Sequence, residues 1–272
     1  MLSVRKDLEQ KGYVVLDRVL SEERCDQLRE HANELVEHYQ ENQDRTIFST
    51  HSNQQARNQY FIDSCDKIHF FWEEGAFDKS GELIYPKIKA INKIGHGLHI
   101  HDEIFRNFSK QSLFSEVVQE SGYFEQPKVS QSMYIFKQPK IGGEVLCHQD
   151  STFIHTSPDK VLGLWVALEE SHEENGCLWG IPGQYTEKPF QIFKKTEKGC
   201  VFEPEEGQNY ALEKAVPLPV KKGSVILFHG LFPHFSYENR SKESRHAFTL
   251  HYIDKKNRYL ESNWNQSKHL LS

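Results

Sequence analysis

The chain has 272 residues, a formal net charge of −6 and 37% hydrophobic residues. That length suits one large domain, because β-rich barrels and sandwiches often run to roughly 200–250 residues as a unit. The apolar content is enough for a sizeable core and argues against global disorder. The acidic balance gives no electrostatic case for binding nucleic acid or an anionic membrane surface.

Targeting signals and cysteines restrict the compartment. Residues 1–20 contain no apolar segment of a signal peptide, and no stretch approaches the roughly 18 apolar residues of a membrane-spanning helix. The chain does not end in the Ser-Lys-Leu peroxisomal signal. The cysteines lack CxxC spacing, which favours reduced thiols and argues against a disulfide framework or a structural zinc site. They are Cys25, Cys65, Cys147, Cys177 and Cys200. We therefore expect a cytoplasmic protein.

The first half of the chain is predicted to be mainly helical. Ser21 is a candidate N-cap, because Glu22 and Glu23 follow it in a first turn that favours carboxylates. A polar loop is expected over residues 41–58. Apolar residues at three- and four-residue spacing predict helices over 4–10, 22–40 and a zone at 85–121, with a strand at 13–16.

From about residue 129 the pattern changes to short β-rich runs separated by Gly and Pro. The runs are 129–136, 161–168, 176–181, 224–228 and 247–253. Strands at this spacing without intervening helices favour an antiparallel barrel or sandwich. The predicted fold class is α+β with a mainly β core, a jelly roll with N-terminal and flanking helices. We expect one domain over 1–272, made of a helical N-terminal region (1–125), the jelly-roll core (126–255) and a tail (256–272).

The sharpest local motif is His148-Gln149-Asp150. On a strand, alternation would place His148 and Asp150 on one face. An imidazole and a carboxylate so placed are two ligands of the 2-His-1-carboxylate set that holds non-haem Fe(II) and leaves positions open. His-x-Asp also occurs by chance, so the motif needs a second histidine brought close by the fold.

The apolar segment 224–228 leads to two candidates for that ligand, His229 and His234, which the local pattern cannot separate. Arg245 follows eleven residues after His234 and opens a β-rich stretch. A buried arginine is costly unless its charge is paired. The partner is either an ordinary Asp or Glu, or a dicarboxylate ligand gripped by the guanidinium fork.

A competing cluster comprises His96, His99, His101 and Asp102. On a helix, His96 and His99 would share a face. The segment lacks a partner motif such as His-Glu-x-x-His, and partly buried or solvated histidines are the alternative interpretation.

The spacing of His148, Asp150, His234 and Arg245 resembles that of the phytanoyl-CoA dioxygenase (PhyH) family. Further strings carry the resemblance over nearly the whole chain, most weakly between residues 185 and 217. They are Ile91-Asn92-Lys93-Ile94-Gly95-His96, Gln131-Ser132-Met133-Tyr134-Ile135-Phe136-Lys137-Gln138-Pro139, Gly142-Gly143-Glu144-Val145 and Glu174-Asn175-Gly176-Cys177-Leu178-Trp179.

The resemblance implies a double-stranded β-helix that uses Fe(II), 2-oxoglutarate and dioxygen, with ascorbate as a candidate reductant. It implies iron ligation by His148, Asp150 and His234, and favours His234 over His229. Arg245 would pair with the distal carboxylate of 2-oxoglutarate. Lys93, Met133 and Trp165 would line the cosubstrate pocket. From the residues alone, these three are equally a solvated helix lysine, a core gap-filler and a plain core residue.

The resulting hypothesis is an Fe(II)- and 2-oxoglutarate-dependent dioxygenase that hydroxylates a small molecule and releases succinate and CO2. The substrate remains open between a lipid-like molecule and a polar metabolite, because a fold does not determine substrate choice. Two alternatives are a non-catalytic jelly-roll binding protein and a zinc or manganese hydrolase or isomerase. The second alternative would not need Arg245.

Overall fold

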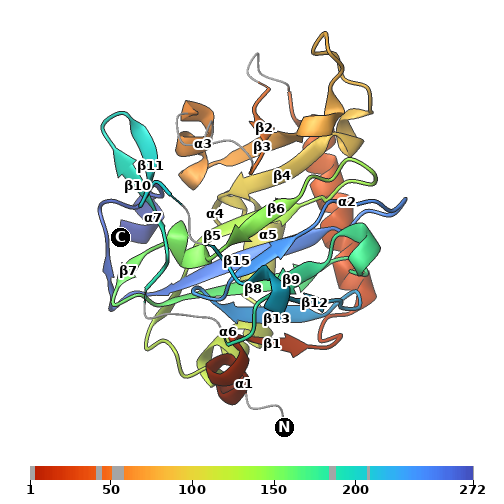
Figure 1. Cartoon of the computed structure of the whole chain (residues 1–272). Coiled ribbons are helices and arrows are strands. Elements are labelled where there is room, and N and C mark those ends of the chain that lie inside the picture. The colour runs from red at the N-terminus through yellow and green to blue at the C-terminus, as the bar shows by residue number, and fades with distance from the viewer. Residues whose placement is uncertain (1–3, 41–44, 51–57, 184–187, 207–208, 272) are drawn as a thin grey trace.

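The structure is a computed structural model that describes residues 4–40, 45–50, 58–183, 188–206 and 209–271. Figure 1 shows the arrangement of its helices and strands. Of the predicted polar loop, residues 41–44 and 51–57 lie outside the described residues.

The helices occur mainly in the first half of the chain. Ser21 caps α2 as predicted, because its side chain accepts a hydrogen bond from the Arg24 backbone N–H. The α-helices are α1 (Val4–Lys11), α2 (Glu22–His38), α3 (Gln59–Asp63), α4 (Leu98–His101), α5 (Glu103–Ser109), α6 (Ser112–Glu120) and α7 (Lys268–Leu271).

Strands occur throughout the chain. The first eight are β1 (Tyr13–Leu16), β2 (Ile47–Phe48), β3 (Ile68–Glu73), β4 (Ile91–His96), β5 (Pro127–Ile135), β6 (Val145–His148), β7 (Thr156–Ser157) and β8 (Val161–Ala167). The others are β9 (Leu178–Gly180), β10 (Ile192–Thr196), β11 (Gly199–Glu203), β12 (Val216–Leu218), β13 (Val225–His229), β14 (His234–Ser236), β15 (Ala247–Asp254) and β16 (Arg258–Tyr259).

Two sheets form the body of the described structure. The larger has eight strands in the order β1-β13-β8-β15-β5-β4-β3-β2, and the smaller has four in the order β12-β9-β14-β6. Their neighbouring strands are antiparallel, apart from the parallel pair β2 and β3. Two sheets with non-sequential strand order form a jelly roll.

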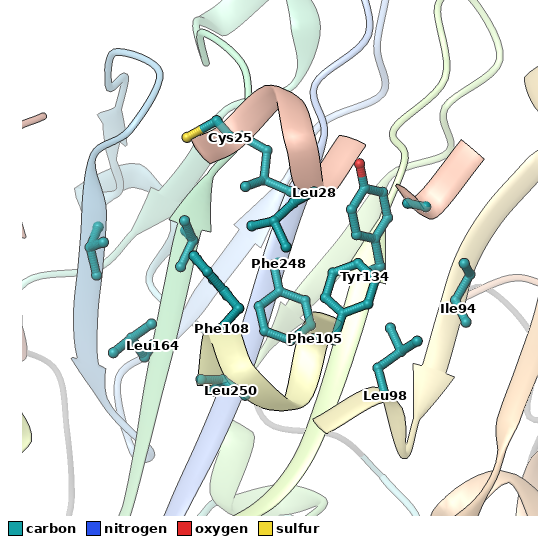
Figure 2. Close-up of a cluster of buried hydrophobic side chains, with 14 of the residues drawn as sticks. Cys25, Leu28, Ile94, Leu98, Phe105, Phe108, Tyr134, Leu164, Phe248 and Leu250 are labelled. Atoms are coloured by element: carbon teal, nitrogen blue, oxygen red, sulfur yellow. The ribbon is translucent and has the colours of Figure 1, made fainter. Parts of the chain in front are cut away.

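Alternation along the central strands separates two cores. On β8, Leu162, Leu164 and Val166 belong to the larger core, which also contains the buried faces of α2, α5 and α6. Figure 2 shows residues of α2 and α5 packed with Phe248 and Leu250 of β15. The intervening Trp165 and Ala167 belong to a second core, together with Leu178 of the smaller sheet. The helices therefore cover one face of the large sheet, and the smaller sheet covers the other.

Most of the predicted elements are confirmed. The N-terminal helix and strand and the long helix correspond to α1, β1 and α2. The five β-rich runs correspond to β5, β8, β9, β13 and β15, and the jelly-roll fold class is that of the structure. All five cysteines are free.

The prediction of a helical zone over 85–121 is wrong at its start. Residues Ile91–His96 form β4, which pairs with β3 on one side and β5 on the other. The spacing of apolar residues there resembles a helix, but long-range pairing outweighs local periodicity. Residues 1–125 are thus not simply helical, since they also supply strands to both edges of the large sheet.

Candidate metal centre

His148, Asp150 and His234 meet at one point in the structure. His148 ends β6 and His234 begins β14, and these two residues are direct partners in the smaller sheet. The Nε2 atoms of both histidines lie 3.8 Å from Asp150 Oδ1. The three ligand atoms lie within 4.8 Å of one another. This is a spacing that one metal ion can bridge.

The expected strand containing both His148 and Asp150 is corrected in part. β6 ends at His148, Gln149 is still extended, and Asp150 begins a 3₁₀ turn that runs to Thr152. The Gln149 side chain donates to the Leu231 carbonyl at 2.7 Å. This bond ties the His-x-Asp segment to the loop before His234.

Both histidines are held in the tautomer that a metal requires. His148 Nδ1 lies 2.8 Å from the Leu146 carbonyl, and His234 Nδ1 lies 2.9 Å from the Phe232 carbonyl. A carbonyl only accepts, so each Nδ1 carries the proton and each Nε2 keeps its lone pair. Burial, followed by the neighbouring His234, lowers the pKa of His148 to about 4. His148 is therefore neutral and able to ligate at neutral pH.

The carboxylate of Asp150 is ionised. Burial opposes ionisation, but the adjacent His251 and His234 outweigh it and hold the pKa of Asp150 below its ordinary value. Two imidazoles and one carboxylate are donor types that fit Fe(II), and the donor set is that of a facial triad with open positions.

Arg245 is buried, and its guanidinium lies beside a backbone carbonyl and an aromatic ring. Its Nε donates to the Gly176 carbonyl at 3.1 Å, and its guanidinium lies 5.3 Å from the centroid of the Trp165 ring. Burial lowers the pKa of Arg245 to about 10, which leaves it charged at neutral pH. Among the described residues its Nη1 is buried without a hydrogen-bond partner, and no ion pair of Arg245 with a carboxylate is formed. The guanidinium thus has unused capacity for an anionic ligand.

Met133 and Trp165 lie in one row across the large sheet. Thr249 of β15 pairs with Met133 of β5 on one side and with Trp165 of β8 on the other. Arg245 precedes β15, with Ala247, Thr249 and His251 following at alternate positions, and His251 contacts Asp150. The row therefore lies between the guanidinium and the converging His148, Asp150 and His234.

Lys93 lies on a strand and is buried, so the interpretation as a solvated helix lysine is wrong. Its Nζ is 3.4 Å from the centroid of the Phe48 ring, with Phe61 and Phe71 also within cation–π range. Burial lowers the pKa of Lys93 to about 7. Its strand position is beside Ile135 of β5, close to the Met133 row.

The structure separates the two candidate histidines. His229 is at the end of β13, where its Nδ1 accepts from the Leu231 backbone N–H and its ring contacts Tyr123. It is not among the three residues that converge, whereas His234 is.

The competing histidine cluster does not converge on one point. His96 Nδ1 contacts Ser64 Oγ, His99 Nδ1 contacts Ser132 Oγ, and Asp102 caps α5. His101 instead lies beside Asp66 and His269, in a partly exposed group.

Sequence reasoning missed several polar residues around the centre. Thr249 and His251 alternate with Phe248, Leu250 and Tyr252 along β15. That alternation was a usable signal, because it places the two polar side chains on the face opposite the helices. Ser236 was also missed; it lies two residues beyond His234, and its Oγ accepts from buried Lys137 Nζ at 2.9 Å.

The jelly roll and its converging His-Asp-His set define the class of non-haem iron dioxygenases. Within that class, the chain belongs to the phytanoyl-CoA dioxygenase (PhyH) family, whose model matches residues 8–247.

Relatives share most of the chain's length. It is 41% identical over 276 residues to a phytanoyl-CoA dioxygenase domain-containing protein 1 homolog of Caenorhabditis elegans, covering 98% of this chain and 96% of the relative. It is 42% identical over 268 residues to phytanoyl-CoA dioxygenase domain-containing protein 1 of Danio rerio, covering 94% and 91%.

The fold is also that of EctD from S. alaskensis, solved with 2-oxoglutarate and 5-hydroxyectoine. The TM-score is 0.66 at 17% identity, with 96% of this chain and 78% of that chain covered. Within the described residues, no helix combines the length and apolar character needed to cross a membrane.

Proposed function

We propose that this protein is an Fe(II)- and 2-oxoglutarate-dependent dioxygenase that hydroxylates a small-molecule substrate. The observation that carries the proposal is the pairing of two features. Three ligand atoms converge with both imidazole Nε2 atoms free, and a buried guanidinium nearby has no acidic partner among the described residues. The first feature suits Fe(II), and the second suits a dicarboxylate.

His148, Asp150 and His234 would hold the iron. A facial triad of this kind occupies three positions and leaves three, enough for a bidentate cosubstrate and dioxygen. When bound, Fe(II) and 2-oxoglutarate supply the oxidative chemistry, in which 2-oxoglutarate is decarboxylated to succinate and one oxygen atom enters a substrate C–H bond.

Arg245 would bind the distal carboxylate of 2-oxoglutarate through its free guanidinium nitrogen. Ser236, whose hydroxyl accepts from Lys137, still has a proton to donate to a neighbouring carboxylate. Trp165 and Met133 would line the space between that carboxylate and the iron, and exclude water from it. Lys93 would add a positive charge on the β4 side of the same space.

A zinc or manganese hydrolase would leave the buried Arg245 unexplained. An experiment can distinguish an enzyme that turns over substrate from a protein that only binds a metal and a ligand. Anaerobic titration of the Fe(II) protein with 2-oxoglutarate should produce a weak visible charge-transfer band, and admission of oxygen should release succinate. The proposal is wrong if no band forms, or if His148→Ala leaves succinate formation unchanged.

The substrate is best sought without assuming a CoA ester. We suggest an untargeted screen of small metabolites for 2-oxoglutarate-dependent mass gains of one oxygen atom. A His234→Ala protein, processed in parallel, identifies mass gains that do not come from the centre.

A further inference from the structure

Asp150 presents its two carboxylate oxygens to different neighbours. Oδ1 faces the Nε2 atoms of His148 and His234, each 3.8 Å away. Oδ2 lies 3.0 Å from Nε2 of His251, a histidine on β15 that is 3% exposed. One oxygen is therefore directed to the metal site and the other to a buried imidazole.

The proton on His251 is fixed from both sides. Its Nδ1 lies 3.3 Å from the side-chain nitrogen of Gln131, which can only donate. Nδ1 must then accept, which places the ring proton on Nε2, the nitrogen that lies 3.0 Å from Asp150 Oδ2. The carboxylate of Asp150 favours the same tautomer, because an ionised carboxylate only accepts hydrogen bonds and is stabilised by a donor nearby.

The backbone around His251 aims the ring at Asp150. The pairing of β15 with β5 shifts register between His251 and Tyr252, so that Ser130 is an extra residue on β5. Ser130 Oγ donates to the His251 carbonyl at 3.1 Å. Bulges of this kind often re-aim a side chain beside an active site.

The backbone of β8 packs closely against the Asp150 carboxylate and leaves it little room to move. Gly163 of β8 pairs with His251, and a Cβ at this position would lie 2.6 Å from Asp150 Oδ2 and 2.3 Å from the Phe228 ring. The carboxylate thus rests directly on the backbone of the large sheet.

We propose that His251, held by Gln131, is a positioning residue that keeps Asp150 a monodentate ligand of the iron. The inference rests on the proposed function. With Oδ2 in contact with His251 Nε2 at 3.0 Å, Oδ1 is the oxygen left for the metal. Without that contact the carboxylate could rotate and chelate with both oxygens, which would remove one of the three positions needed by 2-oxoglutarate and dioxygen. The histidine therefore protects the oxygen-binding position.

The test compares His251→Leu with His251→Gln. Leucine removes the donor, whereas the glutamine amide can still donate to Oδ2. Neighbours that orient metal ligands typically contribute 10–100-fold to metal affinity. We expect Co(II) affinity, measured by isothermal titration calorimetry, to fall by about ten- to a hundredfold in His251→Leu and to be largely restored in His251→Gln.

A second measurement reports whether the position for dioxygen on the iron is open. Nitric oxide, a dioxygen analogue, is added anaerobically to the Fe(II) protein saturated with 2-oxoglutarate. We expect the S = 3/2 EPR signal of the nitric oxide adduct in the wild type and in His251→Gln. We expect a much weaker signal in His251→Leu, even at Fe(II) and 2-oxoglutarate concentrations that saturate the variant.

Two further variants separate this effect from damage to the fold. Tyr252→Leu removes a buried ring from the next position of β15, on the opposite face, and should leave both readouts unchanged. Gln131→Leu does not touch Asp150 but frees the tautomer of His251, and should weaken Co(II) binding by about three- to tenfold, less than His251→Leu. It also tests the proposal if His251→Leu does not fold.

Equal Co(II) affinity and equal EPR intensity in the wild type and His251→Leu would overturn the inference and leave the proposed function standing. If Gln131→Leu is the only variant that folds, Co(II) affinity and EPR intensity equal to those of the wild type would likewise overturn the inference. A wild-type protein that binds neither Co(II) nor Fe(II) would overturn the proposed function and this inference with it.

Discussion

Two groups of two histidines and one aspartate converge within the described residues: His148, Asp150 and His234 in the jelly roll, and Asp66, His101 and His269 near its surface. Their donor atoms are the same, and both sets lie within 4.8 Å. They differ in burial: the side chains of Asp150 and His234 are 8% exposed, whereas those of His101 and His269 are 42% and 54% exposed.

They differ more in where the imidazole protons are. In the buried group, backbone carbonyls hold the proton on Nδ1 and leave Nε2 free. In the surface group, His101 Nε2 lies 3.1 Å from the Asp66 carbonyl and 3.3 Å from its carboxylate, so this nitrogen carries the proton. The same residue types thus leave both Nε2 atoms free of hydrogen bonds in one place and form a hydrogen-bonded surface contact in the other.

The largest effect should follow from removing a ligand of the buried group. His234→Ala deletes one of three donors, and we expect Fe(II) affinity and succinate formation to fall by more than about a hundredfold, beyond the usual effect of a neighbouring group. Anaerobic calorimetry and a coupled succinate assay measure the two. Retention of near wild-type iron binding would point to His229 as the ligand instead.

The next largest effect concerns Arg245. Truncating one partner of a buried charge pair typically costs 2–5 kcal/mol, so Arg245→Ala should weaken 2-oxoglutarate binding by about thirtyfold to several thousandfold. Arg245→Lys keeps the charge but loses the fork, and should be intermediate. Fluorescence or calorimetric titration of the metal-loaded protein gives both values, with Fe(II) affinity as the control. Unchanged 2-oxoglutarate affinity in Arg245→Ala would show that the anion binds elsewhere.

The parts of the centre that could be predicted are those whose residues lie close together in the sequence or match the spacing of a known family. His148 and Asp150 are two residues apart, and His234 with Arg245 could be placed through family spacing. The strand β4 could not be predicted, because its pairing with β3 and β5 joins segments whose apolar spacing resembles a helix. Two other features depend on atoms that the fold brings together. They are the lack of an acidic partner for Arg245 among the described residues, and the tautomers of His148 and His234. Only the folded arrangement reveals them.

Lys93 should make 2-oxoglutarate binding sensitive to pH. Its pKa of about 7 means that the charge is present below that pH and is lost above it. Wild-type affinity should therefore decline as pH rises through 7 to 9. Lys93→Met should bind about tenfold more weakly at pH 6, the effect of losing one hydrogen bond to a charged group, and should show little dependence on pH over this range. A parallel slope in both proteins would exclude Lys93 as the titrating group.

The buried group should also make the metal-free protein sensitive to acid. The pKa of His148 is about 4 in the folded state and about 6.5 when unfolded, so the unfolded chain binds the proton first between these values. Stability is then lost as pH falls from about 6.5 towards 4. We expect Tm to drop by roughly 5–10 °C over this window, and by more when Co(II) is bound, because ligated histidines cannot take up the protons that the unfolded chain binds. Calorimetric scans with and without Co(II) test this, and identical pH profiles would argue against metal ligation by His148.

The smallest effect should come from the surface group. His101→Ala and His269→Ala remove two of its three donors without touching the jelly-roll strands, so Fe(II) affinity and succinate release should stay within about twofold of the wild type. Such small changes are usual for surface substitutions. Native mass spectrometry with one and two equivalents of Zn(II) gives the more demanding measurement. One ion should bind to the wild type and to His101→Ala, and none to His234→Ala. If the wild type binds a second ion and His101→Ala does not, the surface group recruits metal despite the proton on His101 Nε2. Burial and tautomer would then not explain the difference between the two groups.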